Sequence, residues 1–124
     1  MADIAIDFDG TCVFHCYPEV GADNPSAVEV LKKLYEHNHN LILYTMRSGK
    51  ELNDAIKWFE DREIPLYAVN INPEQLSWTN SPKVCAALYI DDCGVGCPLL
   101  FDGIRSYVDW NKINEILTVS GFFV

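Results

Sequence analysis

Short apolar runs recur along the chain, and amphipathic segments separate them. The runs are continuous rather than alternating, which is typical of strands that are buried on both faces of a parallel sheet. We therefore expect a sheet of about five strands. The predicted strands are Ile4–Ile6, Leu41–Tyr44, Leu66–Val69, Ala86–Ile90 and Leu99–Phe101.

Two of the intervening segments carry apolar residues at the spacing of an amphipathic helix. Each opens with a serine followed three residues later by a glutamate, which is the pattern of a capping box. The boxes are Ser26 with Glu29 and Ser48 with Glu51. The apolar stripes behind them are Ala27, Val30, Leu31 and Leu34 in the first helix and Leu52, Ala55, Ile56 and Phe59 in the second.

Two further helices are predicted nearer the C-terminus. A short one is expected to begin at Ser81 and Pro82, because proline is favoured at the first helical position. The other follows Asp109, and its inward face comprises Trp110, Ile113, Ile116 and Leu117. Strands that alternate with helices imply right-handed crossovers and parallel pairing. The pattern therefore predicts an α/β fold built on a three-layer, doubly wound parallel sheet.

Length and composition fit a single globular domain over residues 1–124. The chain is 49% hydrophobic and 22% charged, as in folded rather than disordered proteins. No apolar run approaches the ~20 residues that a membrane span needs. No basic stretch precedes an apolar run, as it would in a signal peptide. We expect a cytoplasmic protein that does not bind membranes.

The chain is strongly acidic. Eighteen aspartates and glutamates oppose nine lysines and arginines, which gives a formal net charge of −9. This balance disfavours extended contact with the phosphate backbone of a nucleic acid. An anionic substrate stays compatible with it, because a bound metal ion can reverse the sign of the charge locally.

Four of the five cysteines form two C-x3-C pairs, Cys12 with Cys16 and Cys93 with Cys97. An odd number of cysteines without a signal peptide favours reduced thiols. The spacing is not one that zinc sites commonly use. We therefore expect reduced, metal-free thiols near the functional edge of the sheet, with a zinc site as the alternative.

Polar side chains follow several predicted strands. In doubly wound folds, ligands bind beyond the carboxyl ends of the strands, so these side chains are the candidates for a site. They are Asp7 and Asp9 after the first strand, Thr45 and Arg47 after the second, Asp91 and Asp92 after the fourth, and Lys83 just before the fourth.

The candidates form a coherent chemical set. Four carboxylates in a small space repel one another unless a cation lies between them, and oxygen ligands suit Mg²⁺. Thr45 offers a hydroxyl beside the exposed N–H groups of a helix, which favours an anion. Lys83 is predicted in the first turn of a helix, against the helix dipole, and such local conflicts often mark functional sites. Arg47 either binds a second anionic group of the substrate or forms a salt bridge with one of the acids.

The motifs resemble those of the haloacid dehalogenase (HAD) superfamily. The run Asp7-Phe8-Asp9-Gly10-Thr11 matches its D-x-D-G-T signature. Thr45, Lys83 and the pair Asp91-Asp92 resemble its second, third and fourth motifs, in the same order. Receiver domains of response regulators use similar groups, but there the acidic pair follows the first strand and the phosphorylated aspartate lies mid-chain.

The resemblance implies a Mg²⁺-dependent phosphomonoesterase. Asp7 would attack phosphorus and form an aspartyl-phosphate, and Asp9 would transfer protons to the leaving oxygen and from water. Mg²⁺ would be held by Asp7, the backbone carbonyl of Asp9, and either Asp91 or Asp92. His15, close behind the first motif, is a further candidate for substrate contact. A phosphotransferase, or a catalytically silent binding or regulatory module, is the alternative function.

The gaps between the motifs are too short for an inserted cap domain. After the helix at Ser26 is allowed for, only Cys12–Pro25 remains of the first gap, which is enough for a hairpin-like flap. The second gap is filled by a helix, a strand and a loop. We therefore expect a capless member with an open site, which in the family implies a bulky phosphorylated substrate or a partner chain that closes the site.

Overall fold

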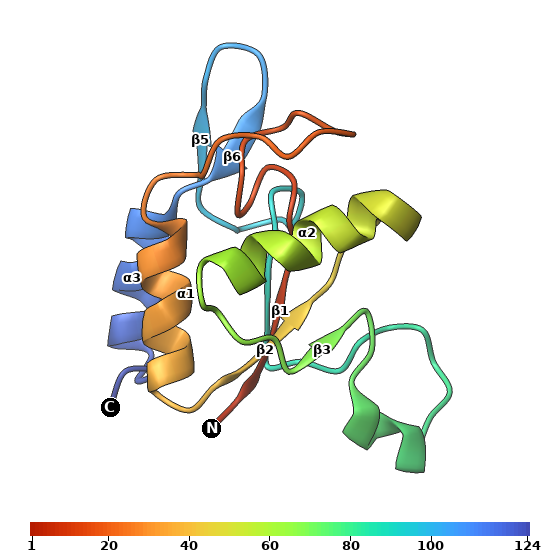
Figure 1. Ribbon diagram of the computed structural model, residues 1–124. Helices are drawn as coiled ribbons and strands as arrows, with labels where there is room; N and C mark the ends of the chain where they lie inside the picture. Colours follow the sequence, from red (N-terminus) through yellow and green to blue (C-terminus); the bar gives the residue numbers. More distant parts are fainter.

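The computed structural model describes residues 1–124 and contains a four-stranded parallel sheet (Figure 1). Its strands are β1 (Asp3–Ile6), β2 (Asn40–Leu43), β3 (Ala68–Val69) and β4 (Leu88–Ile90). Their order in the sheet is β3-β2-β1-β4. The predicted α/β class and the parallel pairing are therefore confirmed, and the arrangement is Rossmann-like.

Three α-helices match the predicted apolar stripes. They are α1 (Ala27–Glu36), α2 (Gly49–Asp61) and α3 (Trp110–Val119), and α1 and α3 lie side by side (Figure 1). Neither predicted capping box forms a side-chain cap. Ser26 has a left-handed φ of 69°, and its hydroxyl donates to Asn111 Oδ1 across the interface with α3.

One predicted helix is absent, and one predicted strand belongs to a different sheet from the one expected. The segment at Ser81 and Pro82 forms bends rather than a helix. The short helix of this region is instead the 3-10 helix η1 (Pro73–Ser77), which begins with a different proline, Pro73. The run Leu99–Phe101 forms β5, but it pairs antiparallel with β6 (Ser106–Val108) in a separate two-stranded sheet that projects from the body (Figure 1). The turn at Asp102 closes this hairpin locally, because its carboxylate accepts hydrogen bonds from two backbone N–H groups.

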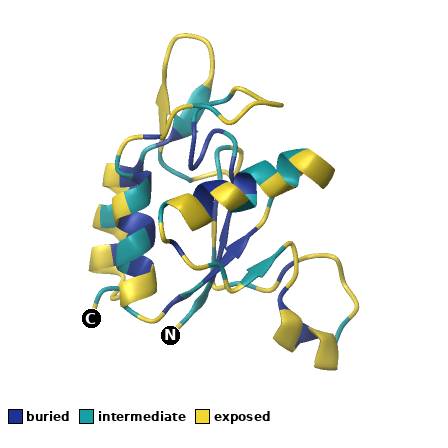
Figure 2. Ribbon diagram, in the orientation of Figure 1, coloured by how far each residue is buried: buried dark blue, intermediate teal, exposed yellow.

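All three α-helices share one hydrophobic core with one face of the sheet. That face presents Ile4, Ile6, Leu41, Leu43 and Ile90. Buried residues accordingly concentrate in the strands and on the inner sides of the helices, while the tip of the β5–β6 hairpin is exposed (Figure 2). None of the helices combines the length and the apolar composition needed to cross a membrane.

The opposite face of the sheet has no α-helix. Ala5, Ile42 and Tyr89 point to this face, because side chains alternate along a strand. The connection from β3 to β4 crosses it, and its only helix is η1. The predicted three-layer arrangement therefore holds for the path of the chain, but its second helical layer is missing.

Candidate functional site

A cavity of about 740 Å³ opens at the carboxyl ends of β1, β2 and β4. It lies where the chain changes direction across the sheet, since β2 and β4 flank β1 on opposite sides. Six of the seven predicted site residues line it: Asp7, Asp9, Thr45, Arg47, Asp91 and Asp92. The seventh, Lys83, does not.

Asp7 follows β1 directly, and its backbone N–H continues the ladder by donating to the carbonyl of Ile90 at 3.0 Å. Thr11 Oγ1 donates to Asp7 Oδ2 at 3.1 Å. Burial raises the pKa of Asp7 to about 7, and the nearby charge of Asp92 adds to the effect. Hydrogen bonds from the Phe8 backbone and from Thr11 lower the pKa in part.

The two acids that follow β4 point in different directions. Asp92 lies against Asp7, and its Oδ2 is 2.8 Å from His15 Nε2. Asp91 turns back on its own loop, where Oδ1 accepts hydrogen bonds from the backbone N–H groups of Cys93 and Gly94. Only Asp92 of the predicted pair therefore faces Asp7.

Gly10 makes room for this cluster. A Cβ atom at this position would lie 2.2 Å from His15 Nε2 and 2.5 Å from Asp92 Oδ2. Its φ of +77° also lies in the left-handed region that disfavours other residues. The glycine of the first motif is thus required both by its backbone conformation and by the close approach of these two side chains.

Asp9 is bound on both oxygens by Arg47. Arg47 Nε donates to Asp9 Oδ2 at 2.7 Å, and Nη2 donates to Oδ1 at 2.8 Å. This two-bond geometry is the strong form of a carboxylate–guanidinium pair. The hydrogen bond with Asp9 raises the pKa of Arg47 above its ordinary value.

Arg47 also anchors the loop between β1 and α1. Its remaining hydrogen bonds go to the backbone carbonyls of Pro18, Glu19 and Glu51. All five of its N–H donors are therefore used, and the side chain is buried. Of the two roles predicted for Arg47, the structure therefore has the salt bridge with an acid. Binding of a substrate anion by Arg47 does not fit, because no N–H donor of the guanidinium is left for the anion.

Thr45 lies where it was predicted, but Lys83 does not. Thr45 lies in the cavity, and its Oγ1 accepts a hydrogen bond from the backbone N–H of Arg47 just ahead of α2. Lys83 stands outside the cavity, with Nζ 5.7 Å from the centre of the Tyr89 ring. The helix that was to present it to the site is absent.

The expected cluster of four carboxylates reduces to a pair. No three His, Cys, Asp or Glu side chains converge in a way that can hold a metal ion. Asp9 is held by Arg47 and Asp91 by its own loop, so only Asp7 and Asp92 present their carboxylates to each other. Any metal site here is therefore built on this pair together with backbone oxygen atoms.

The cysteines are free thiols. Cys12 is buried, its Sγ lies 3.3 Å from the carbonyl oxygen of Asp7, and burial raises its pKa well above the ordinary value. Cys93 is exposed, with Sγ 3.6 Å from Asp92 Oδ1, and the charge of Asp92 raises its pKa. One thiol of each C-x3-C pair thus lies next to one of the two facing acids.

Several residues that line the cavity were not predicted from the sequence. Tyr17, Tyr44, Met46, Tyr89 and Arg105 all line the cavity. Two of them, Tyr44 and Tyr89, belong to the predicted strands Leu41–Tyr44 and Ala86–Ile90, whose continuous apolar runs predict burial on both faces. The alternation of side chains along those strands was the signal that could have placed Tyr44 and Tyr89 on the other face.

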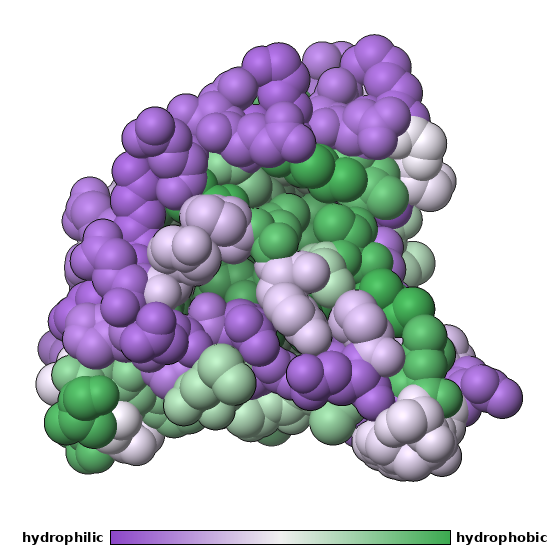
Figure 3. All heavy atoms as spheres, turned by 60° about the horizontal axis from the view of Figure 1, so that its bottom comes forward, coloured by the Kyte–Doolittle hydropathy of each residue, from purple (hydrophilic) through white to green (hydrophobic).

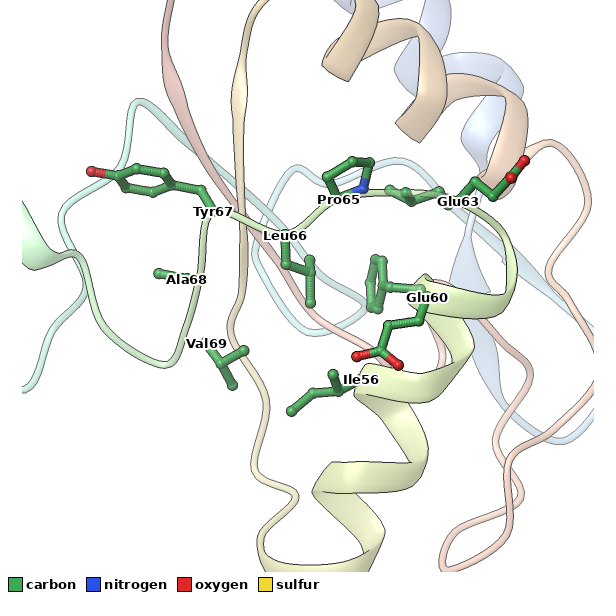
Figure 4. Close-up of a pocket in the computed structure, with 10 residues that line it drawn as sticks. Ile56, Glu60, Glu63, Pro65, Leu66, Tyr67, Ala68 and Val69 are labelled. Carbon is green, nitrogen blue, oxygen red and sulfur yellow. The ribbon is translucent and has the colours of Figure 1, made fainter.

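A second cavity, of about 610 Å³, lies between α2 and the segment that leads into β3 (Figure 4). It is mostly apolar, and it contains none of the predicted site residues. Figure 3 shows a face of the molecule on which hydrophobic residues line a hollow bordered by hydrophilic residues. The candidate catalytic and metal-binding side chains lie instead in the first cavity.

The raised pKa of Asp7 predicts a pH-dependent effect of Asp7→Asn on stability. Folded wild-type protein keeps a proton on Asp7 that the unfolded chain releases above pH 3.8, so its free energy of unfolding falls as pH rises toward about 7. Asparagine never ionises. Without divalent ions, the variant should exceed the wild type by roughly 2–4 kcal/mol above about pH 7, and the gain should vanish below about pH 4.

Denaturant unfolding in EDTA across this pH range measures the difference. Asp61→Asn is the matched control, because Asp61 is an exposed partner of Lys57 on α2. A stability difference between Asp7→Asn and wild type that does not change with pH would contradict the assignment of the raised pKa to Asp7.

No protein-family model matches the chain, and no curated protein matches it. A solved structure of a conserved protein from Bacteroides thetaiotaomicron is similar, with 42% sequence identity and a TM-score of 0.79. The similarity covers 96% of this chain and 91% of that one. Sequence and fold therefore agree over nearly the full length of both proteins. The chain belongs to the same family as this conserved Bacteroides thetaiotaomicron protein.

Proposed function

We propose that the protein is a Mg²⁺-dependent phosphomonoester hydrolase of the HAD type. The observation that carries the proposal is the half-buried carboxylate of Asp7, which lies against Asp92 in the cavity at the carboxyl end of β1. A carboxylate whose pKa is strongly raised by partial burial in a cavity is a common feature of functional sites. The D-x-D-G-T run around it supports this particular chemistry.

Asp7 and Asp92 fit a magnesium ion by the chemistry of their donors. Neither carboxylate forms an ion pair with a lysine or arginine, and only His15 pairs with Asp92. Two carboxylate groups and the backbone carbonyl of Asp9 would supply oxygen ligands, with water completing the set. When bound, the ion would neutralise the pair and withdraw charge from a phosphoryl oxygen.

Asp7 is held in a way that suits a nucleophile. Thr11 donates to Oδ2 and so fixes the direction of the carboxylate that would attack phosphorus. The P–O bond to the leaving group breaks as the aspartyl-phosphate forms, and water later releases inorganic phosphate and regenerates Asp7. Thr45, beside the start of α2, would contribute its hydroxyl to the phosphoryl oxygens.

Asp9 would move the protons in both steps. Arg47 occupies one lone pair on each oxygen of Asp9, and each oxygen keeps a second one for a proton. We infer that Arg47 acts as a positioning residue that fixes the direction of this carboxylate. The role of Lys83 in binding the phosphoryl group stays a prediction. Its ammonium lies over Tyr89, outside the cavity.

A phosphatase assay tests the proposal directly. Wild-type protein should hydrolyse 4-nitrophenyl phosphate with Mg²⁺ and stop in EDTA. Asp7→Asn should lower kcat by about 10³-fold or more, because an amide oxygen is a poor nucleophile. Asp54→Asn, on α2 away from the cavity, is the control. Transfer to an added alcohol without release of phosphate would favour the phosphotransferase, and an inactive wild type would favour the binding module.

Magnesium binding can be measured apart from turnover. Mg²⁺ in excess should raise the Tm of the wild type by several degrees, because a ligand that binds only the folded state stabilises it. The shift should disappear in Asp92→Asn. It should persist in Asp91→Asn, because an asparagine at this position keeps the oxygen that accepts from Cys93 and Gly94. Equal shifts in all three proteins would exclude Asp92 as a ligand.

Arg47→Lys tests the positioning role. Lysine keeps the charge but cannot form the two-bond pair with Asp9. We expect kcat to fall roughly 10- to 100-fold with little change in KM, because the guanidinium has no donor free for substrate. Arg62→Lys, which alters the pair with Asp23 outside the cavity, should leave both constants unchanged. A rise in KM with kcat preserved would instead indicate direct substrate binding by Arg47.

A further inference from the structure

The cavity continues from Asp7 onto the face of the sheet that has no α-helix. Asp7 and Ala5 share this face of β1, two residues apart. Tyr44 follows β2 beside Asp7, and Tyr89 of β4 pairs with Ala5. The two tyrosine rings thus stand on either side of β1, next to the candidate nucleophile.

The rings converge over Ala5. Neighbouring strands are about 4.8 Å apart, so β2 and β4, which flank β1, are separated by about twice that distance. The ring centres of Tyr44 and Tyr89 nevertheless lie only 6.2 Å apart, with an angle of 50° between their planes. Ala5, on the strand between them, is buried, and its small side chain leaves room for the rings to lean together.

The aromatic surface is open, and its Tyr89 ring is held in place. Tyr44 and Tyr89 keep 38% and 39% of their surface exposed, whereas Phe8 on the helical side is fully buried. The Tyr89 hydroxyl donates to the carbonyl of Val84 at 2.6 Å, and Lys83 Nζ lies over the same ring. A fixed aromatic face loses little conformational entropy when a flat ligand stacks on it.

We propose that Tyr44 and Tyr89 bind a flat aromatic ring carried by the leaving group of a phosphate monoester, the ring of a nucleobase or of a phenol. This rests on the proposed function for the role of the ring as leaving group. Arg105 lines the same cavity without any ion pair, so the cavity also offers a free cation to an anionic ligand. The cavity volume of about 740 Å³ suits a ligand the size of a nucleotide.

Binding of uncharged ligands tests the aromatic surface without turnover. Adenosine and N-acetyltyrosinamide are titrated against the wild type and against Tyr44→Leu in EDTA, with saturation-transfer NMR as the readout. Tyr44→Leu keeps an apolar side chain at an exposed strand end but removes the flat ring. Tyr35→Leu is the control, because Tyr35 is an exposed tyrosine on α1 outside the cavity.

We expect at least one of the two ligands to bind the wild type and the control, and Tyr44→Leu to weaken its binding by roughly 10-fold. Which ligand binds tells a nucleobase from a phenol. Failure of both ligands to bind the wild type, or equal binding by Tyr44→Leu, would overturn the proposal.

Turnover gives the second readout. In the wild type, kcat/KM for adenosine 5′-monophosphate or for phosphotyrosine should exceed kcat/KM for glycerol 3-phosphate, so that the ratio of the two is above one. It should fall roughly 10-fold in Tyr44→Leu but not in Tyr35→Leu. A wild type that prefers glycerol 3-phosphate would overturn the proposal. Ligand binding without hydrolysis of any ester would contradict the proposed phosphatase and would still support the aromatic site.

Discussion

The contact between the carboxyl groups of Asp7 and Asp92 is the interaction on which the site depends. Pairing of β1 with β4 brings the two strand ends together, and Gly10 leaves space for the second acid. Thr11 holds Asp7, and the buried Asn24 holds the Thr11 carbonyl in turn at 2.9 Å. Two like charges in a partly buried position oppose folding. Such a local cost is typical of functional sites.

The sequence predicted the local elements of the fold better than their partners. The apolar stripes identified all three α-helices, because periodicity depends only on the segment itself. Ser26 failed as a side-chain cap because packing of α1 against α3 offered its hydroxyl another partner, Asn111. The run Leu99–Phe101 was correctly predicted as a strand. An apolar run does not indicate which strand it pairs with, and here the turn that follows pairs it with β6 in a hairpin.

For the site, sequence predicted positions along the chain but not the directions of side chains. Strand ends located six of the seven candidates correctly, because parallel strands bring their carboxyl ends to one edge. The Asp91 carboxylate points away from Asp7 because it accepts a hydrogen bond from the backbone N–H of Cys93, two residues further on. The Asp9 carboxylate is paired with Arg47, 38 residues further along the chain. The predicted position of Lys83 required a helix that does not form, so its side chain lies outside the cavity.

The missing helical layer explains how so small a domain keeps an open cavity. In a doubly wound sheet, the connection that returns across β1 normally covers the second face with a helix. Here that connection carries only the short η1, and the Val84 carbonyl beyond it contacts the Tyr89 hydroxyl rather than covering the ring. Sheet face that would otherwise be buried under a helix is thereby left to Tyr44 and Tyr89, whose rings tolerate both apolar contact and water. The shortened connection contributes no side chain to the cavity, so the two rings themselves form its wall beside Asp7.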